Sequence, residues 1–237
     1  VCGLDHNFNP RRIERYLTVA WDSGARPVVV LNKADLCGDV ERRVGMVEAL
    51  APGAPVHAVC ARSGDGVDAL ARYLSVGQTV ALVGSSGVGK SSLINRVLGE
   101  ERLRVGETRA SDGRGRHTTT RRELIALPGG GLLMDTPGMR ELGLWGDEDS
   151  LDGSFADIEA LAEGCRFRDC RHQGEPGCAV AAAVERGEIS EGRWENFKNL
   201  QKELRYLALK QDTSARLAER ARWKPIAKAI KRLPKKG

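Results

Sequence analysis

Residues 84–91 read GSSGVGKS and are the strongest indication of the fold of this chain. It follows TVALV, an apolar run typical of a buried strand, and precedes KSSLINRVLG, which has helical spacing. The pattern G-x-x-x-x-G-K-S/T in this context indicates a phosphate-binding loop, whose glycines let backbone N–H groups point at phosphate oxygens beside a helix N-terminus. The predicted nucleotide contacts here are Gly84, Ser85, Ser86, Gly87, Val88, Gly89, Lys90, Ser91 and Ser92.

Apolar runs and helical patterns alternate along the first part of the chain. This alternation predicts an α/β fold with a doubly wound, mainly parallel sheet, in which continuous apolar strands are buried on both faces. The segments RELIAL (122–127) and LLMD (132–135), separated by PGGG, predict a hairpin, and residues 105–122 predict a mobile loop. The predicted strands are 27–32, 55–60 and 79–84, and the predicted helices are 9–24, 40–51, 66–75 and 90–99.

The tetrapeptide NKAD at residues 32–35 points to guanine as the base. The Asp35 carboxylate can accept hydrogen bonds from N1–H and the 2-amino group of guanine, whereas adenine offers an acceptor at N1 and would leave it unpaired. The Lys33 stem can lie along the base, and Asn32 can brace neighbouring loops. CARSGDG (60–66) follows the next strand, and its backbone N–H groups around Cys60, Ala61 and Arg62 are expected to donate to guanine O6.

DTPG (135–138) and RHTTT (116–120) predict the remaining parts of a GTP site. Asp135 is expected to hold Mg²⁺ through water and the Gly138 N–H to contact the γ-phosphate. Ser91 and one threonine, assigned as Thr118 although the sequence does not distinguish the three, complete the magnesium ligands.

The predicted catalytic residues are Lys90, His117 and Thr118. Ras-type enzymes place a glutamine after this motif to orient water, but here the residue is Met139, which predicts slow intrinsic hydrolysis. His117 is the candidate replacement within the chain, with a phosphate or RNA contact, or an ordinary surface histidine, as the alternatives.

The order of the motifs is circularly permuted, because NKAD precedes the phosphate loop. A compact domain tolerates such reordering, since its termini often lie close together. The γ-phosphate-contacting motif therefore leads directly into the C-terminal region. We expect residues 139–164 to relay the nucleotide state to that region.

The segment CRFRDCRHQGEPGC (165–178) predicts a metal site. Three thiolates and an imidazole in this short span match a closed, tetrahedral structural zinc site, with reduced cysteines in a loop as the alternative. The neighbouring arginines Arg166, Arg168 and Arg171 can face RNA phosphates. The expected ligands are Cys165, Cys170, His172 and Cys178.

The charge of the chain is concentrated at its end. Residues 216–236 hold nine basic residues and one acid, against a net charge of +5 for the whole chain. This favours a polyanionic partner, nucleic acid ahead of membrane, over a merely solvated tail. No run is long and apolar enough for a membrane span, and the scattered cysteines suit a reducing cytoplasm. A helix from Arg193 with an apolar stripe and another over 150–164 predict a helical domain at 149–237, after a GTPase domain at 1–148.

Taken together, NKAD, GSSGVGKS, GRHTTT, DTPG and the cysteine segment resemble the RsgA family, also called YjeQ, and FNPRRIERYL and PVVVLNKADL add to the likeness. The resemblance covers nearly the whole chain. It implies a cytoplasmic, monomeric GTPase stimulated by the 30S ribosomal subunit, a role in late maturation of that subunit, contact with 16S rRNA, one Zn²⁺, and Mg²⁺ with GTP. Family members also carry an N-terminal OB-fold that this sequence lacks, and VCGLD looks like the tail of a strand, so we expect a fragment.

Two readings from other classes stay open. One is a GTP-gated RNA-binding module whose turnover is incidental, and the other is a P-loop ATPase or kinase. The family's usual Ser-Ala in the base-contacting loop is Cys60-Ala61 here, with little effect expected because the contact runs through the backbone.

Overall fold

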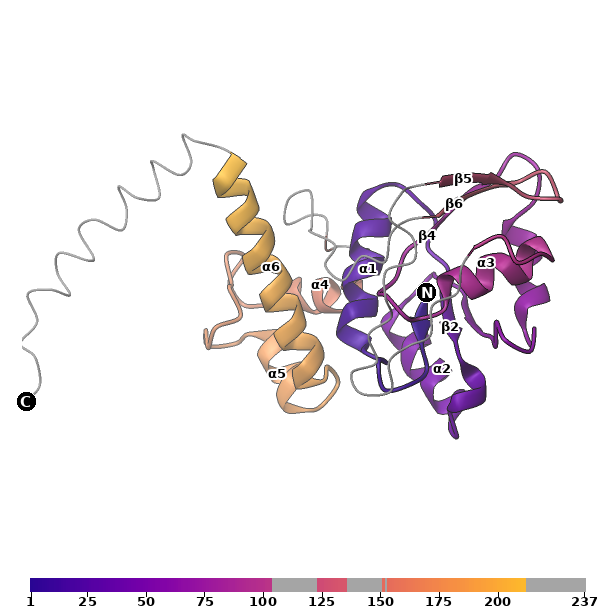
Figure 1. The fold of residues 1–237 in the computed structure, drawn as a ribbon. Helices are drawn as coiled ribbons and strands as arrows, with labels where there is room; N and C mark the ends of the chain where they lie inside the picture. The colour runs from indigo at the N-terminus through magenta and orange to yellow at the C-terminus, as the bar shows by residue number, and fades with distance from the viewer. Residues whose placement is uncertain (104–122, 136–150, 152, 212–237) are drawn as a thin grey trace, which may run out of the picture. The chain divides into compact units, whose positions relative to one another are not determined.

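The computed structural model describes residues 1–103, 123–135, 151 and 153–211, and it forms two compact units, Val1–Gly143 and Leu144–Gly237 (Figure 1). The boundary expected between 148 and 149 lies outside the described residues, as does the predicted loop at 105–122, so both stay predictions. Among the described helices, none has the length and apolar character needed to cross a membrane.

The first unit alternates strands and helices, as the sequence predicts. The segment expected as a helix over 66–75 is a 3₁₀-helix. The elements are β1 (Cys2–Gly3), α1 (Pro10–Asp22), β2 (Val29–Asn32), η1 (Ala34–Leu36), α2 (Val40–Leu50), β3 (Val56–Ala58), η2 (Val67–Tyr73), β4 (Thr79–Leu82), α3 (Lys90–Leu98), β5 (Glu123–Ala126) and β6 (Leu132–Asp135). Helix α1 begins at Pro10, within the predicted segment 9–24: the Asn9 side chain accepts from the Arg12 N–H, and Pro10 occupies the first turn.

The strands form two three-stranded sheets, in the orders β1-β2-β3 and β4-β6-β5. The first sheet is parallel, β4 pairs in parallel with β6, and β5 and β6 form the predicted antiparallel hairpin. The amino group of Val1 donates to the carbonyl of Val83 over 2.6 Å, so the start of β1 touches the end of β4 (Figure 1).

Strand β2 is the middle strand of the first sheet, and its side chains pack against helices on both faces. Val29 and Leu31 pack on one side with Ile13 of α1 and Val47 of α2. Val30 points the opposite way, as alternate strand residues must, and packs with η2 and α3. The residues of η2 and α3 in that second cluster are Val67, Leu70 and Leu93.

The apolar sequence of β4 predicts a strand that is buried on both faces, and this prediction is wrong. Thr79 and Ala81 are exposed, while Val80 and Leu82 are partly buried. The reason is that α3 covers one face of this sheet, where Ile94 packs against Ile125 and Leu133.

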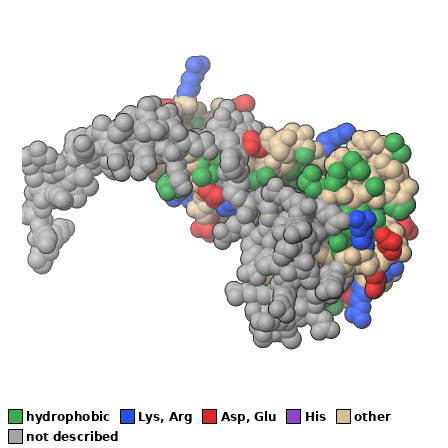
Figure 2. Space-filling model, turned by 45° about the horizontal axis from the view of Figure 1, so that its top comes forward, with side chains coloured by type: hydrophobic (Ala, Val, Ile, Leu, Met, Phe, Trp, Pro, Cys, Tyr) green, Lys and Arg blue, Asp and Glu red, His purple; other side chains and the backbone are tan. Residues whose placement is uncertain are grey.

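On the opposite face of the same sheet, Leu124 and Met134 pair across the hairpin and are 56% and 36% exposed. Figure 2 shows apolar side chains gathered over the part of this unit where β5 and β6 lie in Figure 1.

The second unit is helical, with α4 (Ala156–Ala162), α5 (Ala179–Glu185) and α6 (Glu191–Gln211). The apolar stripe predicted for the helix from Arg193 packs inward on α6, because Phe197, Leu200 and Leu204 are buried. The ring of Phe197 meets the ring of Phe155 edge-on at 5.3 Å between centroids. Helix α4 is shorter than the predicted 150–164 segment, and α5 was not predicted.

Candidate nucleotide-binding and metal sites

The phosphate loop runs from the end of β4 to the first turn of α3. Gly87 and Gly89 take left-handed backbone angles, with φ of 80° and 95°, which curl the loop before the helix starts at Lys90. Lys90 is 8% exposed, and its ammonium donates to the carbonyls of Gly84 at 2.8 Å and Ser85 at 3.0 Å. The loop therefore folds back over its own lysine, which leaves a positive charge at the helix start where phosphates bind.

Asn32, at the end of β2, joins this loop to the loop after β3. Its side-chain amide donates to the carbonyl of Val88 at 2.9 Å, and its side-chain oxygen accepts the N–H of Ala61, also at 2.9 Å. Asn32 is 2% exposed, so both bonds are shielded from water. NKAD, which comes first in the sequence, is thereby held against a phosphate loop more than 50 residues later.

Gly89 shows how closely these two loops approach. A β-carbon at Gly89 would collide with the side-chain nitrogen of Asn32. A glycine is therefore required at this position for its left-handed φ and also for the space that Asn32 occupies.

Lys33 has an unusual backbone for a residue with a side chain, with φ of 65° in the left-handed region. Its ammonium donates to the carboxylate of Asp5 at 2.7 Å, and Asp5 lies in the loop after β1. Burial raises the pKa of Asp5, but the Lys33 ammonium and the Asn7 N–H more than offset this, and the net pKa is lowered. Asp5 thus fixes the position of the Lys33 side chain in the NKAD loop.

Asp35 lies in η1 and is exposed, as a carboxylate that meets a base must be. The Cys60 thiol donates to it over 3.0 Å between Sγ and Oδ1. Arg96 of α3 donates to the carbonyls of Ala61 and Arg62, and these bonds hold the loop after Cys60 against the helix. The predicted base-contacting residues therefore come together at one end of the first unit.

Arg12 on α1 is a further neighbour of the phosphate loop that sequence reasoning missed. Its guanidinium donates to the Ser85 hydroxyl at 3.1 Å. Asp5, Arg12 and Arg96 lie outside the nucleotide-binding motifs, and their contacts span 28 to 73 residues, so spacing along the sequence did not predict these contacts.

The remaining predicted nucleotide contacts lie partly outside the described residues. Asp135 ends β6, paired in register with Leu82 at the end of β4, but its side chain lies outside the described residues. His117, Thr118, Gly138 and Met139 also lie outside them, so their predicted roles stay predictions.

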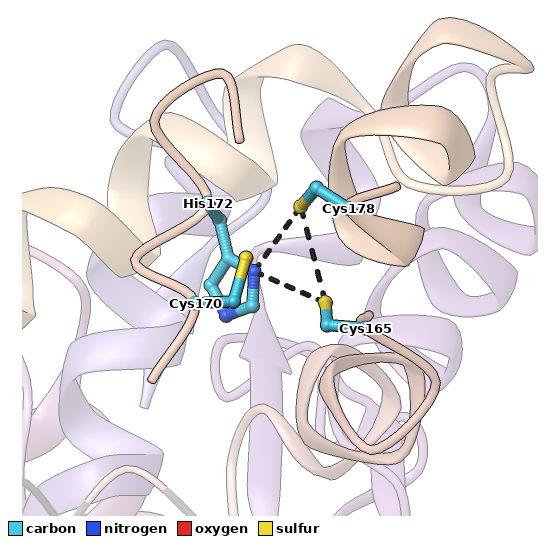
Figure 3. A group of neighbouring side chains, drawn as sticks. All are labelled: Cys165, Cys170, His172 and Cys178. Carbon is cyan, nitrogen blue, oxygen red and sulfur yellow. Dashed lines mark hydrogen bonds between the residues drawn. The ribbon is translucent and has the colours of Figure 1, made fainter. Parts of the chain in front are cut away.

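The four predicted metal ligands converge in the second unit, and their side chains point toward a common centre (Figure 3). Their ligand atoms all lie within 4.8 Å of one another. Cys165 Sγ lies 3.9 Å from Cys178 Sγ, and His172 Nδ1 lies 3.5 Å and 3.3 Å from these sulfurs. A tetrahedral zinc ion needs sulfurs about 3.8 Å apart and sulfur–nitrogen pairs about 3.6 Å apart, given its usual bond lengths. The donor set therefore fits a four-coordinate metal ion.

The backbone of the cysteine segment explains how so short a span can converge. His172 has φ of 57°, a left-handed angle that turns its imidazole back toward Cys165 and Cys178. Gly177 has φ of 77° and lies against Arg166, where a β-carbon would come within 3.1 Å of the arginine side chain. Glu175 accepts from the N–H groups of Arg171 and Gln173, which closes the turn.

The electrostatics of the cluster differ between its ligands: they favour the metal-binding form at His172 and Cys165 and oppose it at Cys170, whose pKa is raised to about 11 by burial and by the neighbouring thiols of Cys178 and Cys165. Burial lowers the pKa of His172, although Glu175 acts in the opposite direction, and a neutral imidazole is the form that ligates metals. For Cys165, burial raises the pKa, but N–H groups of Val180 and Ala179 and the neighbouring thiols outweigh it, so the net pKa is lowered.

The sequence model of the family described as RsgA GTPase matches residues 1–145. The chain belongs to the RsgA GTPase family. A "Small ribosomal subunit biogenesis GTPase RsgA" of Opitutus terrae is 53% identical over 227 residues, which is 95% of this chain and 62% of that protein. "RsgA 2" of Listeria monocytogenes is 47% identical over 98% of this chain and 67% of its own length. The chain thus spans about two thirds of the length of these curated relatives.

Two solved structures share the fold of this RsgA family member. YjeQ from Thermotoga maritima aligns with a TM-score of 0.63 and 32% identity, covering 86% of this chain and 69% of that one. YloQ, described as a circularly permuted GTPase, aligns with a TM-score of 0.58 and 27% identity, covering 85% of this chain and 64% of that one. The predicted fold class, a circularly permuted GTPase fold, is confirmed.

Proposed function

We propose that this chain binds guanine nucleotides and hydrolyses GTP to GDP and phosphate. The observation that carries the proposal is the Asn32 side chain, which bridges the carbonyl of Val88 and the N–H of Ala61. This bridge holds the phosphate loop next to the two loops expected to contact the base. A nucleotide with its phosphates at Lys90 and its base at Asp35 is the ligand that fits this arrangement.

Guanine recognition rests on Asp35, whose carboxylate accepts from N1–H and the 2-amino group. The N–H of Ala61 is already donated to Asn32. We therefore expect the adjacent N–H of Arg62, rather than that of Ala61, to donate to guanine O6. Lys33, held by Asp5, presents its aliphatic stem to the base.

In hydrolysis, Lys90 offsets charge on the β and γ phosphates. Ser91, Asp135 and Thr118 are the residues proposed to hold Mg²⁺, which would neutralise the charge that develops on the phosphates. Because Met139 cannot orient water, the isolated chain is expected to turn over slowly, with His117 as the candidate group for that role.

Base preference tests the nucleotide proposal. The variant Asp35→Asn should bind xanthosine diphosphate more tightly than GDP, since xanthine carries an oxygen where guanine carries its 2-amino group. Wild-type chain should bind GDP and reject ADP. Unchanged GDP preference in the variant would contradict the assignment of Asp35, and tight ADP binding by the wild type would favour an ATPase or kinase.

We further propose that the chain acts on the 30S ribosomal subunit, contacting 16S rRNA and assisting late maturation. Its relatives are named as small ribosomal subunit biogenesis GTPases, which supports this proposal, as does the basic C-terminal sequence. Single-turnover GTP hydrolysis with and without purified 30S subunits is the test. Stimulation by the subunit is expected, and its absence would favour a GTP-gated RNA-binding module instead.

We propose zinc as the metal of the Cys165–Cys178 cluster. Three thiolates and one imidazole are soft ligands that suit zinc, and no fifth group is needed to close the site. The role is structural: the metal ties the cysteine segment to α5, whose start is capped by the Cys178 sulfur accepting from the Ala181 N–H at 3.3 Å.

A further inference from the structure

Helix α1 contacts the phosphate loop through the side chain of Ser85, the second residue of GSSGVGKS. The Arg12 guanidinium donates from Nη1 to the Ser85 hydroxyl at 3.1 Å, across 73 positions of the chain. Tyr16 meets the same residue: burial raises the pKa of Tyr16, although the charge of Arg12 and a side-chain hydrogen bond with Ser85 act in the opposite direction. Arg12 and Tyr16 are four residues apart, so they lie on one face of α1. This face of the helix therefore holds a single side chain of the loop.

The Arg12 side chain starts from a fixed part of the helix. Its backbone N–H donates to Asn9, with distances of 3.2 Å to the side-chain oxygen and 3.1 Å to the backbone carbonyl. On the same helix, Ile13 and Leu17 are buried in a cluster with residues of β2. Helix α1 is thus anchored without help from the phosphate loop, so Arg12 can set the position of Ser85 rather than follow it.

Ser85 connects this contact to Lys90. The Ser85 hydroxyl accepts from Arg12, while the Ser85 carbonyl accepts from the Lys90 ammonium at 3.0 Å. Because both bonds fall on one residue, a side chain fixed by Arg12 restricts the orientation of the carbonyl that receives Lys90. Lys90 is the group expected to reach the β and γ phosphates. A change at Arg12 is therefore transmitted to the phosphates through Ser85 and Lys90.

We propose that Arg12 is a positioning residue for phosphate recognition: through the Ser85 hydroxyl, it holds the loop in the shape that presents Lys90 to the β-phosphate. This rests on the proposed nucleotide function. The role concerns the diphosphate group of the ligand and leaves the reading of the base to Asp35. It also differs from the attraction of phosphate by a bare positive charge, because it depends on a hydrogen bond to one hydroxyl.

The test compares GDP with GMP, which lacks the β-phosphate that Lys90 is expected to contact. Dissociation constants are measured on the full chain by competition against a fluorescent GDP analogue. Arg12→Ala should weaken GDP binding about tenfold, the size of one hydrogen bond from a charged donor. It should leave GMP binding nearly unchanged, so the preference for GDP over GMP falls by a similar factor.

Two controls separate positioning from general effects of charge or stability. Arg11→Ala removes the same charge from an exposed neighbour on α1 and should leave the preference unchanged. In a Ser85→Ala background, Arg12→Ala should change the preference no further, since its effect acts through that hydroxyl. Ser85→Ala alone should lower the preference by a similar factor, which keeps the test decisive if Arg12→Ala does not fold.

Equal weakening of GDP and GMP by Arg12→Ala, or no weakening of either, would overturn the inference while leaving GDP binding by the wild type intact. An effect of Arg12→Ala that persists undiminished in the Ser85→Ala background would show that the charge acts directly on the phosphates, and would overturn it as well. A wild-type chain that does not bind GDP would overturn the proposed function, and the role of Arg12 with it.

Discussion

The ammonium of Lys33 lies 2.7 Å from the carboxylate of Asp5, and this ion pair holds a lysine whose backbone is in the left-handed region. The Asp5 side chain is 8% exposed and that of Lys33 is 21% exposed, so the pair is largely shielded. The conformation of the NKAD loop therefore depends on a residue 28 positions earlier in the chain.

Replacing Asp5 with Asn should destabilise the first unit by about 1–2 kcal/mol at pH 7, because a partly buried lysine loses its charged partner. GDP affinity should fall as well, because Lys33 is no longer fixed. Urea unfolding and GDP titration measure the two effects. Replacing Asp39, whose pair with Arg42 is exposed, is the control expected to change neither.

The pH dependence of the same pair has a defined sign. The folded chain lowers the pKa of Asp5, so Asp5 binds its proton more weakly folded than unfolded. Its contribution to stability is therefore complete above the ordinary pKa of 3.8 and disappears as pH falls through the lowered value. The stability difference between wild type and Asp5→Asn should shrink toward zero below that range, and a difference that persists there would rule out the ion pair as its source.

Gly89→Ala should abolish nucleotide binding and destabilise the first unit by more than about 1 kcal/mol. The added β-carbon would displace the Asn32 side chain and break the bridge between the loops. Gly99→Ala is the matched control, because Gly99 is also left-handed, with φ of 72°, but has no heavy atom within 4 Å of the added carbon. It should cost only the backbone strain and keep GDP binding; equal loss of binding in both variants would contradict the steric argument.

Removing the metal should unfold the cysteine segment. Purified chain is expected to hold one zinc per molecule by elemental analysis, and Cys165→Ser should hold less. Trp194 reports the change by fluorescence, since its ring lies 5.9 Å from that of His172 and stacks on Phe197. Chelation should shift this signal, and Trp194→Phe should remove the shift. A chain that carries no zinc after metal-free-buffer purification and shows no chelation response would refute the site.

Arg193→Ala should destabilise the second unit by about 1–3 kcal/mol, because the Ser154 carbonyl and the Asp157 carboxylate, whose side chain is 45% exposed, lose a charged hydrogen-bond donor. Arg193 is 7% exposed, donates to both oxygens of Asp157 at 2.7 and 2.9 Å, and donates to the Ser154 carbonyl at 2.8 Å. It ties α6 to the start of α4. Arg193→Lys should recover little, because an ammonium cannot form the two-pronged contact.

The control for Arg193 is Arg186→Ala. The Arg186 pair with Glu188 is more than half exposed on both sides and should contribute less than about 1 kcal/mol. Thermal unfolding of the three variants separates them, and similar losses for Arg193→Ala and Arg186→Ala would contradict the role given to the buried Arg193 side chain.

Several features of this protein were determined by local sequence. GSSGVGKS specifies its loop because the glycines and the lysine act within eight residues, and Asn9 with Pro10 starts α1 in the same local way. The cysteine segment contains all four predicted metal ligands within 14 residues. Each of these signals depends on spacing along the chain, which the sequence displays directly.

Contacts between residues that lie far apart in the chain depend on the tertiary structure. The bond from Asn32 to Val88, the pairing of Asp5 with Lys33 and the thiol of Cys60 on Asp35 join residues 25 to 56 positions apart. The exposure of β4 likewise depended on which sheet face α3 covers, and not on its apolar composition. Hydrogen bonds and packing act between neighbours in space, and spatial neighbours are fixed only when the sheets and helices have assembled.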